Sequence, residues 1–148
     1  MRVKNSLEEA ICILLILAVA KGHQPVKSYT ISEQLGVSDS YLKKIMRKLV
    51  LSGLITSSVS KGGGFSLAKQ IQDIYLLDVY NAIEGFSPVI HMNDLADKVF
   101  PTDVEAQIFK ENVARVLLES QQVFLNQLGN YSIEDLLKSK SKSDLESL

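Results

Sequence analysis

The sequence contains one cysteine, Cys12, in 148 residues. A lone thiol excludes a disulfide within the chain, and it excludes a zinc or iron–sulfur site built from several cysteines of one chain. This cysteine usage is compatible with a reducing compartment. Because Cys12 stands between Ile11 and Ile13 in an apolar run, we expect it to be a small core residue rather than a redox centre.

The N-terminal apolar run, Ala10 to Ala20, is shorter than the ~20 apolar residues that span a bilayer. Basic residues before it and small residues at its end give it a superficial likeness to a secretory signal. Glu8 and Glu9, however, stand where such a signal has no acidic residues. We therefore expect a buried first helix, Ser6 to Lys21, which Gly22 ends, in a cytoplasmic protein with no membrane partner.

The sequence also lacks the pattern of a catalytic centre, so we do not expect an enzyme. No nucleophile, base and orienting group are recognisable as a set, and no cofactor or metal is expected. The triplet Gly62-Gly63-Gly64 joins strand to strand and precedes no Gly-Lys-Ser/Thr, unlike a P-loop. His91 is one of two histidines, and a part in recognising an effector remains an alternative to the commoner role of a solvent-exposed histidine.

The near-neutral total charge conceals a strong polarity along the chain. Residues 27–69 carry seven Lys or Arg and two acidic residues, a net charge of +5, whereas the whole chain has a net charge of −1. The remainder of the chain therefore carries −6. A hydrophobic content of 46% suffices for one core, and nothing indicates two independent domains.

The segment from Asp39 to Leu51 predicts a helix with one basic face and one apolar face. Its apolar positions are Leu42, Ile45, Met46, Leu49 and Val50. The centre of the opposite side holds Ser40, Lys44 and Arg47, which Lys43 and Lys48 flank. A solvated helix usually mixes charges of both signs, whereas every charge after Asp39 is positive here. This face therefore indicates contact with DNA.

Turn and cap residues place a second helix before the basic one. Ser28 is expected to be the N-cap of this first helix, and Gly36 supplies the positive φ that ends it. Ser38 is then the expected N-cap of the basic helix, which Gly53 closes. Two helices joined in this way form a helix-turn-helix.

The residues after the basic helix predict a β-hairpin, Leu54 to Ser60 paired with Phe65 to Leu67. The glycine triplet between them admits two interpretations, a tight turn and a close approach of the backbone to a phosphate chain. We expect both. With this hairpin the segment has the order of a winged helix-turn-helix, in which the hairpin is the wing.

The C-terminal half predicts three further helices. Two short ones are expected at Leu76 to Ile83 and Asn93 to Val99. Thr102 and Glu105 form a capping box that starts a helix at Asp103, and no stop signal follows before Gly129. Such a helix has about 26 residues and a length of about 39 Å, too long for one small domain to cover.

The apolar positions of this long helix are more numerous than a lone exposed helix carries, so we expect a partner chain to cover them. An alternative is a helix folded back on its own domain. The predicted dimer-interface residues are Val104, Ile108, Val113, Val116, Leu117, Val123, Phe124 and Leu128.

The expected fold class is mainly α with a small β-hairpin wing, a winged helix-turn-helix domain plus a long C-terminal dimerisation helix. Residues 1–85 form the DNA-binding domain in this division, and residues 86–131 form a connecting segment and the dimerisation helix. Residues 132–148 form a short helix and a tail, disordered from Lys138, where Lys and Ser alternate.

Four motifs together resemble the Rrf-two family of bacterial transcription regulators, the IscR and BadM relatives. The resemblance covers the chain from about Ser6 to Gly85. The motifs are Tyr41-Leu42, Ser52-Gly53-Leu54-Ile55, Gly63-Gly64-Phe65-Ser66-Leu67, and Asp78-Val79 with Ala82-Ile83-Glu84-Gly85. The resemblance implies a homodimer joined by the long helices, with each basic helix in a major groove and each wing beside a minor groove.

The chain departs from this family pattern at two functional places. Many members have an Arg-Gly pair in the wing where this chain has Val59-Ser60, so only Lys61 remains near the expected minor-groove contact. The iron–sulfur members carry three cysteines between the Glu-Gly motif and the early long helix, whereas residues 86–111 contain none. Without thiolates there, the chain resembles a cluster-free branch of the family.

We therefore expect a sequence-specific transcriptional regulator, a repressor rather than an activator, that binds an inverted-repeat operator of double-stranded DNA as a homodimer. A small-molecule effector of unknown identity is a further expected partner. The alternative from another class is a winged-helix protein-interaction module that has lost DNA binding. The expected DNA-binding residues are Ser28, Ser38, Ser40, Tyr41, Lys43, Lys44, Arg47, Lys48, Lys61, Gly62 and Gly63.

Overall fold

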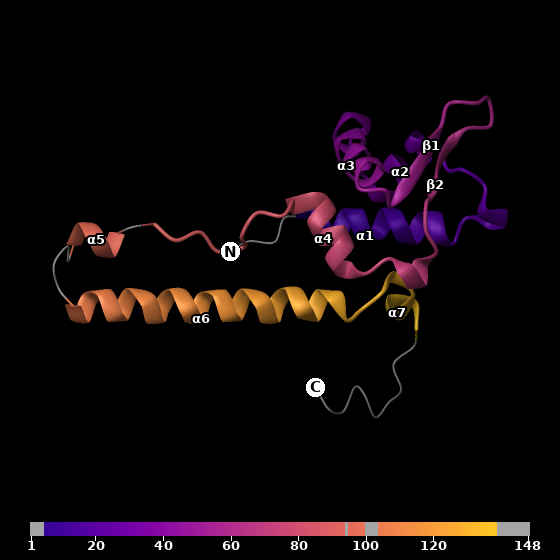
Figure 1. The fold of residues 1–148 in the computed structure, drawn as a ribbon. Coiled ribbons are helices and arrows are strands. Elements are labelled where there is room, and N and C mark those ends of the chain that lie inside the picture. Colours follow the sequence, from indigo (N-terminus) through magenta and orange to yellow (C-terminus); the bar gives the residue numbers. More distant parts are fainter. Residues whose placement is uncertain (1–4, 94, 100–103, 139–148) are drawn as a thin grey trace.

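The computed structural model describes residues 5–93, 95–99 and 104–138. It is mainly helical with one two-stranded antiparallel hairpin, as the sequence predicts (Figure 1). No helix in these residues is long and apolar enough to cross a membrane. In chain order the elements are α1 (Asn5–Ala18), η1 (Lys21–His23), α2 (Ser28–Leu35), α3 (Asp39–Leu51), β1 (Ile55–Ser58), β2 (Gly64–Leu67), η2 (Ile71–Asp73), α4 (Leu76–Glu84), α5 (Leu95–Val99), α6 (Val104–Gly129) and α7 (Ile133–Leu137).

Helix α1 lies at the centre of the N-terminal domain and ends earlier than predicted. Its last residue is Ala18 rather than Lys21, because the backbone is already extended at Ala20; Lys21–His23 then form a separate 3₁₀ turn, in which Gly22 and His23 take positive φ. Ile13 and Leu14 are fully buried, and Cys12 beside them is half-buried. The apolar run of the sequence therefore forms the core of a domain.

The helix-turn-helix has the predicted turn but one different cap. Gly36 ends α2 with φ 66°, and the Ser38 side chain caps α3 by accepting a hydrogen bond from the Tyr41 backbone N–H at 3.2 Å. Ser28 is the first residue of α2 rather than its N-cap; Lys27 holds the cap position, with no side-chain cap bond. The apolar face of α3 is buried as expected, at Leu42, Ile45, Met46 and Leu49, and Val50 packs against the core.

The hairpin is a compact wing attached to the domain at its base. Ile55 pairs with Leu67 and Ser58 with Gly64, so β1 is shorter than the predicted Leu54 to Ser60. Val26 and Phe65 exchange two backbone hydrogen bonds of 2.9 and 2.8 Å. These bonds join the wing to the segment that precedes α2.

Helix α6 contacts its own domain only near its C-terminal end. The rings of Tyr80 in α4 and Phe124 in α6 meet edge to face, with centroids 5.6 Å apart. None of the 26 residues of α6 is buried. Figure 1 shows the N-terminal part of α6 projecting well beyond the domain, with α5 near its far end. The predicted capping box at Thr102 lies outside the described residues.

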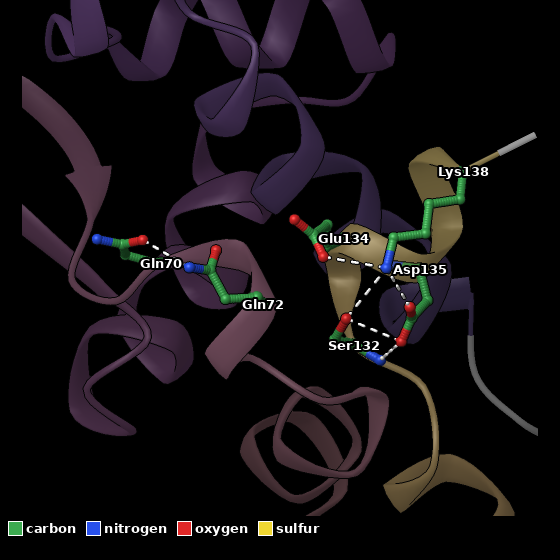
Figure 2. Close-up of polar contacts among 6 residues, drawn as sticks. All are labelled: Gln70, Gln72, Ser132, Glu134, Asp135 and Lys138. Carbon is green, nitrogen blue, oxygen red and sulfur yellow. Dashed lines mark hydrogen bonds and ion pairs between the residues drawn. The ribbon is translucent and has the colours of Figure 1, made fainter.

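The chain returns to the N-terminal domain after α6. Ile133 is fully buried, and its backbone N–H donates to the Ile74 carbonyl at 2.8 Å. The side chains of Ser132 and Asp135 form a capping box at the start of α7, and Lys138 forms ion pairs with Glu134 and Asp135 (Figure 2). This return fixes the C-terminal end of α6. The predicted disordered tail lies almost entirely in residues 139–148, outside the described residues.

Figure 2 also places the 3₁₀ turn η2 beside α7. Within the turn, the Gln72 side-chain amide donates to the Gln70 side-chain carbonyl at 2.7 Å. Ile74 follows η2, and its carbonyl accepts the hydrogen bond from the Ile133 backbone N–H that is described above. The predicted short helices exist with small shifts, α4 reaching Glu84 and α5 beginning at Leu95.

Candidate nucleic-acid interface

Helix α3 and the hairpin lie on the side of the N-terminal domain away from α6 (Figure 1). Ser40, Lys43, Lys44 and Arg47 of α3 are all exposed. Their backbone is held firmly, because the opposite face of α3 is buried in the core. The side chains that the sequence assigns to DNA are therefore presented on a rigid support.

Lys44 and Arg47 are the two cations of this face without an internal partner. Neither has a hydrogen bond or ion pair to any residue that the structure describes. They lie three positions apart, so they project from the same side of the helix. Both side chains can rearrange freely to meet base edges or phosphates.

Lys43 is engaged on the helix surface. Its Nζ lies 2.7 Å from Oδ2 of Asp39, one turn earlier; the Lys43 side chain is largely exposed and the Asp39 side chain is partly exposed. The hydrogen bond from Lys43 lowers the pKa of Asp39, and the nearby Ser28 hydroxyl lowers that pKa further. An exposed pair of this kind is weak, so a phosphate can displace Asp39 from Lys43.

Lys48 has a different environment from the other cations of α3. Its Nζ donates a hydrogen bond to the Ile83 carbonyl oxygen at 2.8 Å, in the last turn of α4. A cation at this position stabilises the C-terminal end of a helix. Lys48 therefore links α3 to α4, a role that the sequence did not suggest.

Tyr41 also has a partner within the chain. Its hydroxyl donates to Oε2 of Glu9 in α1 at 2.8 Å, and this hydrogen bond raises the pKa of Tyr41. The bond fixes the start of α3 against α1. A phosphate contact by the Tyr41 hydroxyl would require this bond to break.

The serines of the helix-turn-helix serve mainly local structure. Ser38 caps α3, and its hydroxyl lies 3.4 Å from that of Ser40. Ser28 lies at the start of α2, near the Asp39 carboxylate that begins α3. All three are close to the N-termini of these helices, where backbone N–H groups favour an anion such as a phosphate.

The tip of the wing contains the predicted Lys61, Gly62 and Gly63, together with a residue that the sequence did not single out. Val59 is fully exposed. A side chain on Gly63 would place its Cβ 2.2 Å from the Ser58 carbonyl oxygen, so only glycine fits this turn. The glycine is therefore required by the hairpin whether or not a phosphate approaches it.

The sequence also did not predict a contact between the connecting segment and α6. The side-chain oxygen of Gln121 accepts hydrogen bonds from the backbone N–H groups of Val89 and Ile90, at 2.7 and 3.2 Å. His91 is exposed in the same segment. Because the bonds join residues about thirty positions apart, no local pattern signals them.

Comparison with known proteins identifies the chain's relatives. The model of the Rrf2 family, described as iron-dependent transcriptional regulator, matches residues 3–139. The chain belongs to the Rrf2 family. This Rrf2 regulator is therefore a helix-turn-helix transcriptional regulator and not an enzyme.

Two relatives and one solved structure illustrate the similarity. YwgB of Bacillus subtilis, named as an HTH-type transcriptional regulator, is 42% identical over 100 residues, which are 68% of this chain and 64% of YwgB. YffB of Lactococcus lactis, named in the same way, is 32% identical over 133 residues, or 90% of this chain and 85% of YffB. The oxidised form of Staphylococcus aureus CymR has a TM-score of 0.68 at 20% identity, covering 96% of this chain and all of CymR.

The residues of this Rrf2 regulator do not fit an iron–sulfur cluster ligated by thiolates of one chain. Its one cysteine, Cys12, is half-buried in α1. Within the described part of the chain, no three His, Cys, Asp or Glu side chains gather closely enough to hold a metal ion. The iron dependence in the family description therefore finds no matching donor set in these residues.

Proposed function

We propose that this Rrf2 regulator is a cytoplasmic repressor that binds an inverted-repeat operator as a homodimer without an iron–sulfur cluster. The observation that carries the proposal is the pair Lys44 and Arg47, exposed and unpaired among the described residues on the anchored helix α3. Repression is expected from steric occupation of promoter DNA by the bound dimer.

In the proposed complex, α3 enters the major groove. Lys44 lies in the first half of the helix, where base edges are usually read, and a lysine can donate to O6 and N7 of guanine. Arg47 lies one turn later and reaches a base edge or the phosphate backbone. Lys43 exchanges its ion pair with Asp39 for a contact with a phosphate. Lys48 keeps its hydrogen bond to Ile83 and holds α3 against α4.

The dimer proposal rests on the apolar surface that α6 leaves exposed. Phe109, Val116 and Val123 recur at intervals of seven and are 68%, 49% and 68% exposed. A seven-residue apolar repeat on a long helix is typical of helix pairing between chains. Val104 and Ile108, near the N-terminal end of α6, are also exposed but lie on a different side of the helix from this stripe.

The predicted interface residues divide between two faces of α6. Phe124 and Leu128 pack against the core of their own domain, which agrees locally with a helix folded back on its own chain. Val113 and Leu117 are half-buried. We therefore centre the proposed interface on Phe109, Val116 and Val123, of which Phe109 was absent from the predicted set.

The test of DNA binding compares Lys44→Ala and Arg47→Ala with the parent by fluorescence anisotropy on DNA from upstream of the gene. Lys98→Ala, an exposed lysine on α5 far from α3, is the matched control. Each of the first two variants should lose about 1–3 kcal/mol of binding free energy, and the control should bind like the parent. Parent-like binding by both Lys44→Ala and Arg47→Ala would refute the docking proposal.

Salt dependence distinguishes DNA binding from a protein-interaction module. Loss of one phosphate contact should reduce the slope of log K against log salt by about 0.9. Lys43→Ala should show such a reduction with little change in base preference. A parent protein with no measurable DNA affinity at low salt would support the interaction module instead.

A further inference from the structure

The tip of the wing presents an apolar side chain where a charged or polar one is the usual choice for solvent. Val59 is fully exposed and lies in the loop that joins β1 to β2. An isolated exposed valine by itself needs no explanation. The position of Val59 does need one, because its hairpin lies on the same side of the N-terminal domain as α3 (Figure 1).

Hydrogen bonds and a steric constraint favour one conformation of the loop around Val59. The hydroxyls of Ser58 and Ser60 lie 3.1 Å apart on either side of Val59, within hydrogen-bonding distance. The Gly63 backbone N–H donates to the Ser60 carbonyl at 2.7 Å, and Gly63 is too close to the Ser58 carbonyl for any side chain. A tight turn of this kind presents Val59 with little loss of entropy on binding.

The chemistry of the tip suits a groove better than a phosphate chain. Lys61 is the only charged residue between Ile55 and Ala68. Val59 has no donor or acceptor, so it gains nothing beside a phosphate. Its branched side chain can instead pack against the sugar walls of a minor groove, without the insertion between base steps that larger apolar wedges make.

We propose that Val59 packs into the minor groove beside each half-site and favours A·T over G·C pairs there. The inference rests on the proposed function, because α3 must occupy the adjoining major groove. The minor groove of A·T-rich DNA is narrow, which brings both sugar walls against the side chain. At a G·C pair the guanine N2 amino group projects from the groove floor and is left without a hydrogen-bond partner by an apolar side chain.

Through this contact, the wing's contribution to DNA affinity should depend on the base pairs in the minor groove and not on the salt concentration. An apolar contact releases no counterions, so it leaves the slope of log K against log salt unchanged. Lys61, two residues away, should contact a phosphate, so its contribution should depend on salt and not on the base pairs. The effects of Val59 and Lys61 on DNA binding can therefore be measured separately.

The experiment uses the full-length protein and three operator duplexes that differ only at the pairs beneath the wing, located by hydroxyl-radical footprinting. These pairs are A·T, G·C or inosine·C, which has the major-groove edge of G·C but lacks the N2 amino group. The parent should bind the A·T and inosine·C duplexes with similar affinity and the G·C duplex several-fold more weakly. Val59→Ala should bind the first two about tenfold more weakly than the parent and lose the discrimination, because two buried methyl groups are removed.

Two further variants test the assignment of roles. Val59→Thr keeps the branched shape and adds a hydroxyl, so it should retain part of the affinity that Val59→Ala loses. Lys61→Ala should reduce the salt slope and keep the preference among the three duplexes. Circular dichroism should show the parent fold for each, because neither residue is buried.

Parent-like binding of all three duplexes by Val59→Ala would overturn the inference. If Lys44→Ala and Arg47→Ala still lost operator affinity in that case, the proposed function would stand and the wing contact alone would fail. A parent protein that binds none of the duplexes would refute both. Equal parent affinities for A·T and G·C duplexes, with inosine·C unchanged, would also refute the groove preference.

Discussion

The Nζ of Lys48 in α3 and the carbonyl oxygen of Ile83 in α4 are joined by a hydrogen bond of 2.8 Å. This bond connects the helix proposed to read DNA to the helix that packs against α6. Tyr80 of the same α4 lies against Phe124 of α6. Movement of α6 can therefore reach α3 through α4.

We predict that Lys48 contributes to stability more than to DNA contact. Lys48→Met keeps much of the aliphatic length and removes the donor, so the free energy of unfolding should fall by about 1 kcal/mol. Urea denaturation measures this change, with Lys44→Met as the matched control that leaves stability within ~0.5 kcal/mol of the parent. If Lys48→Met kept the parent's stability and instead reduced the salt slope of DNA binding, Lys48 would be a phosphate contact.

We predict that charge on the exposed stripe of α6 separates the dimer. Val116→Asp should give monomers, because two like charges would meet across the two-fold axis in an apolar contact. Gln107→Glu adds a negative charge to an exposed position outside the stripe and should leave the dimer intact. Sedimentation equilibrium gives the mass of each. A dimer of unchanged affinity for Val116→Asp would place the interface elsewhere.

Phe124 should behave differently from Val116, because it packs against its own domain. Phe124→Asp is expected to lower the melting temperature rather than only the mass, through loss of the contact with Tyr80. Measuring Phe124→Asp alongside Val116→Asp distinguishes the face of α6 that packs on its own domain from the face proposed to form the dimer.

We predict that Gln121 holds the connecting segment through its side-chain oxygen. Gln121→Leu removes the acceptor, so the backbone amides of Val89 and Ile90 should exchange hydrogen faster and the segment should be cut more readily by protease. Gln121→Glu keeps a carboxylate acceptor and should restore most of the protection. Equal exchange rates in the parent and in Gln121→Leu would show that the segment is held by other contacts.

We predict an acid-sensitive attachment of α7. Hydrogen bonds from Ser132, first its backbone N–H and then its hydroxyl, together with Lys138, lower the pKa of Asp135 to about 2. A carboxyl with a lowered pKa stabilises the fold above its unfolded pKa of about 4, and this stabilisation is lost as the pH falls toward 2. Asp135→Asn should therefore be less stable than the parent near neutral pH, and the difference should shrink between about pH 4 and pH 2. A difference that does not depend on pH would contradict this assignment.

The sequence predicted those parts of the fold that depend on neighbouring residues. Helix α3 has the predicted bounds because Ser38 can cap it locally and because its apolar positions follow the helical period. The turn at Gly36 was likewise predictable from one residue's tolerance of positive φ. The early end of α1 was missed because the backbone becomes extended at Ala20, and alanine does not signal the end of a helix.

The contacts that alter the expected roles of residues in the candidate interface join residues far apart in the sequence. Lys48 looks like Lys44 in the sequence, and only the position of α4 gives it an internal partner. Tyr41 reaches Glu9 for the same reason. Helical periodicity shows that α6 has too many apolar residues, but it does not show which of them face the chain's own domain.

Footprinting on the DNA upstream of the gene tests the central claim most directly. The account predicts two protected half-sites of related, inverted sequence, centred about one helical turn apart, with guanine N7 atoms in each major groove protected from methylation by dimethyl sulfate. Lys44→Ala should lose this N7 protection, whereas Lys98→Ala should keep it. Protection without two-fold symmetry, or a complex in which every major-groove N7 remains reactive, would contradict the account.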